Sequence, residues 1–186
     1  MDLRQLCQGF ASTGRIEAIV LRPARGEPAV SVNVAVAEPG RGLIGDRRAA
    51  GKQSGRQSPK REITLFQAEH LPLVAGWCGL DYLDPLRLRR NLLISGLNLV
   101  GMRSPFPDTQ LEWAVGHEVR IRITGPCDPC DPCSKMATEL GAGSYNALRG
   151  HGGMTAAIVA GGVIRVGDSV SLHAVTTRPA KISTDD

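Results

Sequence analysis

The stretch Ile121 to Gly153 reads IRITGPCDPCDPCSKMATELGAGSYNALRGHGG. It begins inside an alternating apolar–polar run, residues 119–124, which predicts a half-buried strand. A short helical run follows at residues 134–140. Between them lie three of the chain's five cysteines, Cys127, Cys130 and Cys133. We therefore expect a strand-to-helix turn that presents thiols at a helix N-terminus, where the peptide dipoles stabilise thiolate.

The rest of the chain shows the same short periodicities. Alternating or buried apolar runs predict further strands at residues 15–21, 29–37, 62–66, 91–95, 155–160 and 170–175. One longer helix is expected at residues 67–80, with Pro72 in its first turn. Two similar turns, at residues 115–119 and 166–170, have the composition of hairpins or barrel corners. Many short strands with few short helices favour a mostly β domain, and a barrel over a sandwich.

The composition is that of a soluble protein. The 186 residues suit one domain at residues 14–175, with an N-terminal arm at 1–13 and a flexible tail at 176–186. No apolar run approaches the roughly 20 residues of a membrane span, and the first residues do not resemble a signal peptide. An odd number of cysteines argues against a secreted disulfide framework. We therefore expect a cytoplasmic protein without membrane partners.

Basic residues gather in two places. The net charge is only +4, but arginines and lysines are concentrated between residues 41 and 61 and again between 87 and 90. Either these are solvated loop charges or they form one anion site, because guanidinium groups bind phosphate and carboxylate bidentately. Aromatic residues make up only 4% of the chain, so stacking platforms for nucleic acid are scarce and no nucleic-acid partner is expected.

The cysteine run allows several interpretations. A structural zinc site or an iron–sulfur cluster needs a fourth ligand, which Cys7 or Cys78 would have to supply. A redox dithiol and a purely structural role are also open. The last interpretation is one thiolate bound to a soft metal carried by an anionic cofactor. The nearby turn at residues 143–153 favours it, because Arg149 and His151 stand among glycines that allow close backbone approach to a ligand.

Taken together, these pieces resemble the MOSC family, the domain found at the C-terminus of molybdenum-cofactor sulfurases, and in particular its stand-alone bacterial members. The resemblance covers most of residues 14–172 and is carried by GLIGDRR, REITLFQAEHL, LRRNLLISGLNL, ITGPC followed by PCSKM, LGAGSYNALRGHGG and GGVIRVGDSV. It implies a β-barrel with a few short peripheral helices that binds the molybdenum cofactor (molybdopterin). Through the sulfurases it also associates the domain with pyridoxal phosphate.

The resemblance implies site residues as well. PCSKM is similar to the family's metal-binding motif, which makes Cys133 the expected molybdenum ligand and catalytic residue. The extra Asp-Pro-Cys unit in this chain leaves Cys130 as an alternative, with Cys127 auxiliary. His151 and Asp46 are expected to supply or orient protons. The expected cofactor-binding residues are Arg47, Arg48, Lys60, Arg61, Arg89, Arg90, Asn91, Arg149, Gly150 and Gly152.

The activity implied by the resemblance is reduction of N-hydroxylated compounds, such as hydroxylaminopurines and amidoximes. No motif for NADH or flavin is recognisable, so we expect a separate electron-donating reductase as partner. The alternative is a non-redox carrier of sulfur or cofactor, with a persulfide on one of the three thiols.

Overall fold

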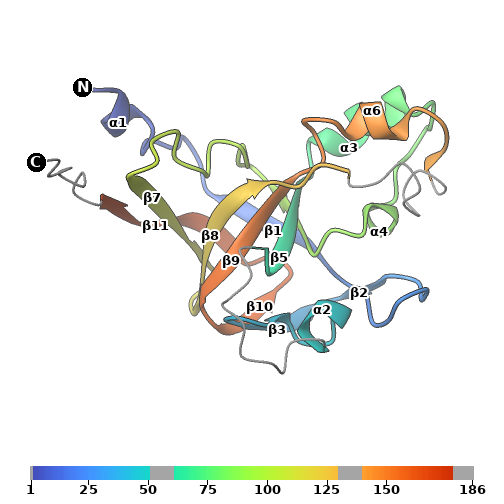
Figure 1. The fold of residues 1–186 in the computed structure, drawn as a ribbon, viewed down its shortest axis with the longest axis horizontal. Helices are drawn as coiled ribbons and strands as arrows, with labels where there is room; N and C mark the ends of the chain where they lie inside the picture. Colours follow the sequence, from blue (N-terminus) through green and yellow to red (C-terminus); the bar gives the residue numbers. More distant parts are fainter. Residues whose placement is uncertain (1, 51–60, 130–139, 178–186) are drawn as a thin grey trace, which may run out of the picture.

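The protein is described by a computed structural model that covers residues 2–50, 61–129 and 140–177 (Figure 1). Its centre is a closed barrel with strand order β11-β7-β8-β9-β5-β6-β1. The pairing of Gly14 in β1 with Val170 in β11 closes it. The strands are β1 (Gly14–Leu21), β5 (Ile63–Gln67), β6 (Leu92–Ser95), β7 (Thr109–Val115), β8 (Val119–Pro126), β9 (Met154–Ala160) and β11 (Ser169–Thr177). The mostly β barrel predicted from the sequence is confirmed.

Only β5 and β6 pair in parallel; the other barrel pairs are antiparallel. A short strand, β2 (Val30–Val32), extends the barrel sheet by pairing with β1. A second sheet has the order β10-β3-β4, from β10 (Gly162–Arg165), β3 (Val34–Glu38) and β4 (Gly42–Leu43). The sequence predicted one strand over residues 29–37, which is wrong. The chain divides at Asn33, whose carbonyl accepts the Val166 N–H at 2.9 Å, and the two halves enter different sheets.

The barrel interior explains the alternating sequence of its strands. Along β7 and β8, every second residue is buried, and Trp113 lies opposite Ile121. Burying the Trp113 indole is inexpensive, since its N–H donates to the Met102 carbonyl at 2.9 Å. This apolar interior fixes the register of the strands, because a shift by one residue would turn the buried side chains outward.

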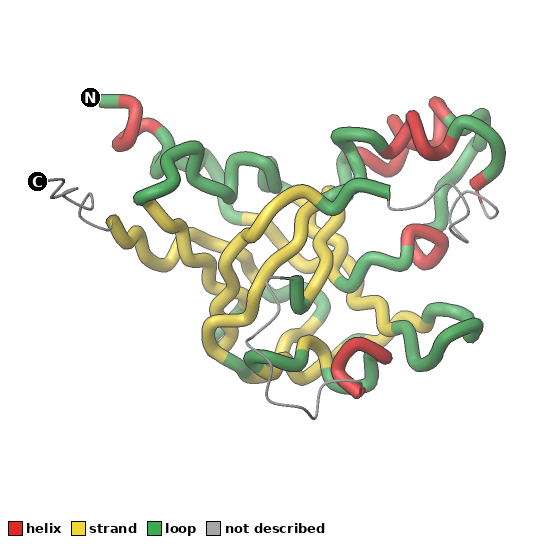
Figure 2. Tube along the Cα trace, in the orientation of Figure 1, coloured by secondary structure: helices red, strands yellow, loops and turns green. Residues whose placement is uncertain are grey.

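Short helices lie outside the barrel (Figure 2). They are α1 (Leu3–Leu6), α2 (Arg47–Ala50), α3 (His70–Trp77), α4 (Pro85–Leu88) and α6 (Ser144–Leu148). Beneath α3, α4 and α6 is a second apolar cluster that includes Phe66, Leu88 and Leu148. Pro72 lies in the first turn of α3, as predicted, although the helix is shorter than residues 67–80. None of the helices in the described ranges combines the length and apolar character of a transmembrane segment.

The N-terminal arm packs against the barrel. Asp2 caps α1, and Arg4 forms a bidentate ion pair with Asp108 at 2.9 and 3.0 Å. The Arg4 guanidinium also stacks over Phe106, and the Phe10 ring meets Trp113 edge-on at 4.7 Å. At the other end, β11 continues to Thr177, two residues beyond the predicted domain boundary. The remainder of the predicted tail, and the predicted helix before Leu140, lie outside the described residues.

Candidate functional site

The segment that carries the three cysteines, residues 127–133 (the cysteine segment), begins where β8 leaves the barrel, as the sequence predicted. Cys127 directly follows β8, and its N–H donates to the Gly153 carbonyl at 2.8 Å. Its thiol is partly buried and not in a disulfide. Cys130 and Cys133 lie outside the described residues, so the identity of the metal ligand stays a prediction.

Arg90 clamps the start of the cysteine segment to the glycine-rich turn. Its Nε donates to the Gly152 carbonyl at 2.8 Å, and its Nη2 donates to the Cys127 carbonyl at 3.0 Å. Both bonds are charge-assisted, which makes them stronger than bonds between neutral groups. The clamp therefore places a cation beside Cys127 and fixes the distance between the two loops.

The preceding residue, Arg89, continues this chain of contacts. It ends α4 in the left-handed conformation, with φ of 55°. Its carbonyl accepts a bond from Arg22 Nη1 at 3.2 Å, and its own Nη1 reaches the Glu27 carbonyl at 3.3 Å. Arg89 thus connects the Cys127 region to the segment that follows β1.

A buried polar network lies at the Arg22 end of this series of contacts. The Asp46 carboxylate accepts bonds from Arg22 Nε at 2.8 Å and Arg22 Nη2 at 3.1 Å. Asn91 Nδ2 donates to the same carboxylate at 3.0 Å, and Asn91 Oδ1 accepts from Arg22 and from the Thr64 hydroxyl. Only 5% of Arg22 and 2% of Asp46 is exposed. The network therefore satisfies a buried ion pair, which would otherwise be costly.

Burial and hydrogen bonding shift the pKa of Asp46 in opposite directions. Burial raises it, but hydrogen bonds from the Arg22 side chain and the Arg48 backbone outweigh burial and hold the pKa below its ordinary value. A carboxylate that is ionised and surrounded by donors is a poor proton source. Of the two roles expected for Asp46, supplying or orienting protons, this geometry disfavours the first and favours a positioning role. The Asn91 amide is likewise committed to the network, which favours a positioning role for it over contact with a cofactor.

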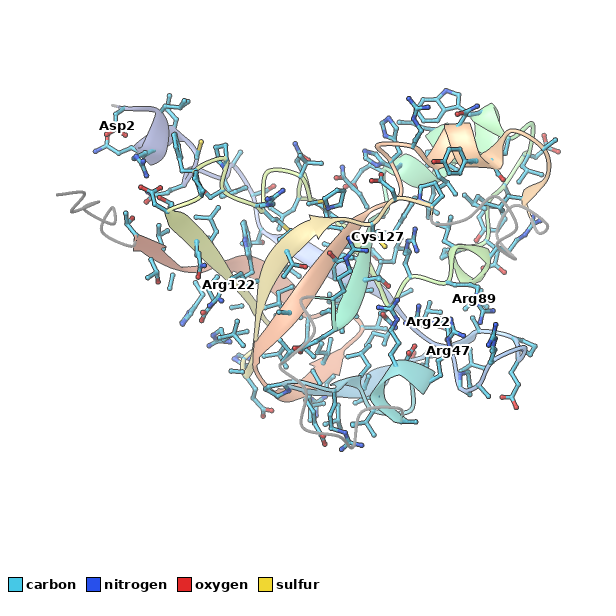
Figure 3. All side chains as sticks on the ribbon, viewed as in Figure 1. Asp2, Arg22, Arg47, Arg89, Arg122 and Cys127 are labelled. Carbon is cyan, nitrogen blue, oxygen red and sulfur yellow. The ribbon has the colours of Figure 1, made fainter. Side chains whose placement is uncertain are left out.

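The predicted arginine cluster assembles around this network. Asp46 accepts the Arg48 N–H at 3.0 Å, which anchors the start of α2, and Arg48 Nη1 in turn donates to the Arg61 carbonyl at 3.1 Å. The side chains of Arg47, Arg48 and Arg61 are exposed. Figure 3 shows Arg22, Arg47, Arg89 and Cys127 on one side of the barrel. Lys60 lies outside the described residues.

We refer to Arg47, Arg48, Arg61, Arg89 and Arg90 as the arginine face, and the buried Arg22 lies behind it. Arg22 was missed by the sequence analysis. The sequence feature that could have identified Arg22 is its position at the end of an apolar strand, directly before Pro23. An arginine that is buried there needs a charged partner.

The glycine-rich turn shows two different uses of glycine. At Gly153, φ is 92° and a side chain would collide with the Leu65 carbonyl; at Gly152 it would collide with the Cys127 carbonyl. These glycines allow the turn to pack against β5 and the cysteine segment. Gly150, with φ of 78°, faces open space. Gly150 therefore remains a candidate for contact with a ligand, whereas Gly152 is a packing residue whose carbonyl binds Arg90.

His151 belongs to a small cluster of rings. Its ring centroid lies 4.9 Å from that of His70 and 4.9 Å from that of Trp77. Burial and the neighbouring His151 lower the pKa of His70. Within the described residues, the buried Nδ1 atom of His151 has no hydrogen-bond partner. An open pocket of about 390 Å³ lies here, lined by His151, Trp77 and Arg149 among others.

The described residues do not form a metal cage by themselves: across 2–50, 61–129 and 140–177, no three Cys, His, Asp or Glu side chains gather at metal-binding distance. Cys78 instead packs against the second apolar cluster. What the region does offer is the arginine face, an open glycine at Gly150 and an imidazole nitrogen with unused bonding capacity. These features fit an anionic, hydrogen-bonding ligand.

Comparisons with known proteins agree with this architecture. The structure of YuaD from Bacillus subtilis superimposes with a TM-score of 0.66 at 17% identity, covering 90% of this chain and 97% of that one. YiiM from Escherichia coli gives 0.60 at 17% identity, covering 86% and 70% of the two chains. YiiM from Geobacillus stearothermophilus gives 0.59 at 17% identity, covering 87% and 75%. No curated protein matches the sequence significantly. The model of the MOSC domain, however, matches residues 31–171, and the chain belongs to the MOSC domain family.

Proposed function

We propose that this protein is a molybdenum-cofactor-dependent reductase of N-hydroxylated compounds and that a thiolate of the cysteine segment binds the metal. Membership of the MOSC family is consistent with a domain that binds the molybdenum cofactor. The observation that carries the proposal is the continuous chain of contacts from Cys127 through Arg90 and Arg89 to the Arg22–Asp46 pair. It brings the arginine face to the base of the cysteine segment.

This arrangement suits a cofactor that is anionic at one end and metallic at the other. The exposed guanidinium groups of Arg47, Arg48 and Arg61 would bind its phosphate bidentately. Arg90 would keep the cysteine segment at a fixed position relative to that phosphate. The Arg22–Asp46–Asn91 network would hold the arginine face in place without contacting the cofactor.

When bound, the cofactor supplies a metal that transfers an electron pair to substrate. The overall reaction is R–NHOH + 2 e⁻ + 2 H⁺ → R–NH₂ + H₂O, in which the N–O bond breaks. His151 is the better candidate to orient or deliver a proton, because its Nδ1 atom is unpartnered in the described structure while Asp46 is fully bonded. The electron pair would come from a separate reductase partner, and we propose that both proteins are cytoplasmic.

An anaerobic reductase assay tests the proposal. The full chain, produced in a host that makes the cofactor, is supplied with reduced methyl viologen and 6-hydroxylaminopurine, and adenine is quantified by chromatography. We expect adenine formation that Cys133→Ser abolishes and that Cys78→Ser leaves intact, because Cys78 packs away from the cysteine segment in the second apolar cluster. Adenine formation that is equal in protein with and without molybdenum would overturn the proposal.

A second candidate function is a carrier that passes sulfur to another protein. The extra Asp-Pro-Cys unit favours it, because a third thiol within the segment provides an additional site for persulfide. Intact-mass measurement of freshly purified protein decides between the two. A carrier shows a mass increase of one sulfur atom that disappears on reduction with a thiol reagent, whereas the reductase shows none.

A further inference from the structure

Strands β7 and β8 pair along only part of their length. Their ladder joins residues 113–115 to residues 119–121. Beyond it, residues 109–112 of β7 pair with β11 and residues 122–126 of β8 run along β9, but within the described chain they do not pair with each other. The two strands therefore separate toward the start of β7 and the end of β8, and we call this opening the β7–β8 seam (Figure 1). Strand edges that do not pair present N–H and C=O groups that can bind other molecules.

A cavity of about 320 Å³ lies in the seam. Its walls are residues 109–111 of β7, residues 122–124 of β8, Ala157 of β9 and the loop between residues 102 and 107. The volume is at the lower end of the range of about 300–1,000 Å³ that is typical of small-molecule sites. The seam therefore has room for a small ligand.

The loop wall of the cavity is held in place by specific contacts. The Met102 carbonyl accepts the Trp113 indole N–H at 2.9 Å, which ties the start of the loop to the barrel interior. At the other end, the Arg4 guanidinium lies 4.3 Å from the centroid of the Phe106 ring and donates to the Thr109 hydroxyl at 2.8 Å. The cavity is thus built by the fold at both ends of the loop.

Arg122 supplies a cationic donor that lacks an acceptor. It lines the cavity, and its Nε atom is buried without a hydrogen-bond partner among the described residues. Its Nη2 atom lies 3.8 Å from Glu112 Oε2, which is too far for a hydrogen bond. A buried donor that stays unpaired is costly, and buried polar groups in proteins are almost always bonded. The Arg122 Nε–H group therefore favours a ligand with an acceptor oxygen.

Other lining groups indicate that this acceptor is an anion. Arg103 brings a second cation to the cavity, and its exposed side chain has no hydrogen bond or ion pair with the part of the chain that the structure describes. The Ser104 hydroxyl accepts the Phe106 N–H at 3.1 Å, which leaves its proton for a ligand. None of the described lining residues is acidic. Two guanidinium groups and a hydroxyl match the oxygens of a carboxylate or phosphate.

We propose that the β7–β8 seam is a second anion site, which binds a small organic acid or phosphate ester through Arg122 and Arg103. The oxyanion accepts the Arg122 Nε–H, and a short apolar body lies against the buried Met102 and Leu111. The site shares no residue with the arginine face. Figure 3 shows Arg122 on a different side of the barrel from the labelled arginines of that face. The proposal is therefore independent of the proposed reductase function.

An NMR titration of the isotope-labelled full chain tests the site, because the Arg122 Nε–H group gives its own signal. The probes are benzoate and phenyl phosphate, with benzamide as the neutral analogue of benzoate, all at constant ionic strength. We expect at least one of the two acids to shift the signals of Arg122 Nε–H and of the Gln110 side-chain amide until they saturate, and benzamide to leave them unchanged. Tighter binding of benzoate would identify a carboxylate as the preferred head group, and tighter binding of phenyl phosphate would identify a phosphate.

Two substitutions on β8 form a matched pair. Arg122→Gln should raise the Kd of the tighter acid, measured at the Gln110 amide, at least about tenfold, because a hydrogen bond from a charged group is lost. Arg120→Gln is the control, since Arg120 projects from the same face of β8 but does not line the cavity. Its guanidinium is bonded to the Val119 and His117 carbonyls at 2.9 and 3.2 Å. The control should change the Kd by less than about twofold, because a more distant charge is screened by solvent.

Two further variants complete the test. Glu112→Gln should lower the Kd, because it removes the carboxylate that competes for Arg122 Nη2. Arg103→Gln should raise the Kd and replaces Arg122→Gln in the comparison if that variant does not fold, since Arg103 is exposed.

Three results would overturn the proposal. Neither acid shifts the Arg122 Nε–H signal, or benzamide shifts it as strongly as benzoate does. In the third case, Arg120→Gln raises the Kd as much as the substitutions in the cavity do, which would reduce the effect to the net charge of the protein surface.

Discussion

Replacing Asp46 with asparagine tests the buried network behind the arginine face. The substitution keeps the size of the side chain but removes the charge that balances Arg22, which is only 5% exposed. It also places an amide opposite the Arg22 Nε and Nη2 donors, now 2.8 and 3.1 Å from carboxylate oxygens. Removing one partner of a buried ion pair costs about 3–5 kcal/mol. This is a large share of the roughly 5–15 kcal/mol that stabilises a typical domain.

The assay is urea denaturation followed by circular dichroism and by tryptophan fluorescence, to which the buried Trp113 and the exposed Trp77 both contribute. The control is Glu38→Gln, which breaks the exposed Glu38–Arg41 pair at 2.6 Å and should cost less than about 1 kcal/mol. Because the pKa of Asp46 is lowered in the folded state, its contribution is present above the unfolded value of about 3.9 and is lost as pH falls through the folded pKa. The difference between wild type and Asp46→Asn should therefore be largest near neutral pH and shrink in acid. If Asp46→Asn costs no more than Glu38→Gln at pH 7, the network does not support the fold.

Three further predictions follow from other parts of the structure. Gly153→Ala should destabilise the protein far more than Gly150→Ala in thermal denaturation, because only an alanine at position 153 collides with backbone. Gly150→Ala should cost only about 1–2 kcal/mol, from the positive φ of that residue. Equal losses of stability in the two variants would contradict this packing. Arg4→Ala should leave the free energy of global unfolding nearly unchanged, because the ion pair of Arg4 with Asp108 is exposed. The same variant should accelerate hydrogen exchange at residues 3–10. Unchanged exchange would mean that Arg4 does not hold the N-terminal arm. His70 should titrate below its ordinary pKa in NMR spectra. His151→Gln should raise the pKa of His70 by removing a like charge beside it. A His70 pKa that does not change in this variant would show that the two rings are not coupled.

The sequence allowed the barrel to be predicted because most of its strands have a local apolar pattern. The alternation in β8 and the apolar run in β5 match strands of the structure within about two residues, whereas β7 was not predicted, although its residues alternate. The division at Asn33 was not predictable in this way. Residues 29–37 alternate without interruption, and only the pairing of β3 with β10, far along the chain, separates them from β2.

The same distinction applies to the site. The clustered arginines and the glycine-rich turn can be recognised from short stretches of the sequence, and in the structure Arg90 connects them. The roles of Asp46 and Asn91 depend on Arg22, which is 24 residues from the first and 69 from the second. No local pattern shows that these three side chains meet. The resemblance led us to expect that Asp46 supplies or orients protons, whereas its buried partner Arg22 favours a positioning role.

The central claim is that the arginine face and the cysteine segment together hold a molybdenum cofactor. The most direct test is elemental analysis of molybdenum, zinc and iron in protein from a cofactor-competent host, for wild type, Cys133→Ser and Cys78→Ser. The account predicts about one molybdenum per chain in wild type and Cys78→Ser, and loss of the metal in Cys133→Ser. Zinc or iron in place of molybdenum, or molybdenum retained in full by Cys133→Ser, would contradict it.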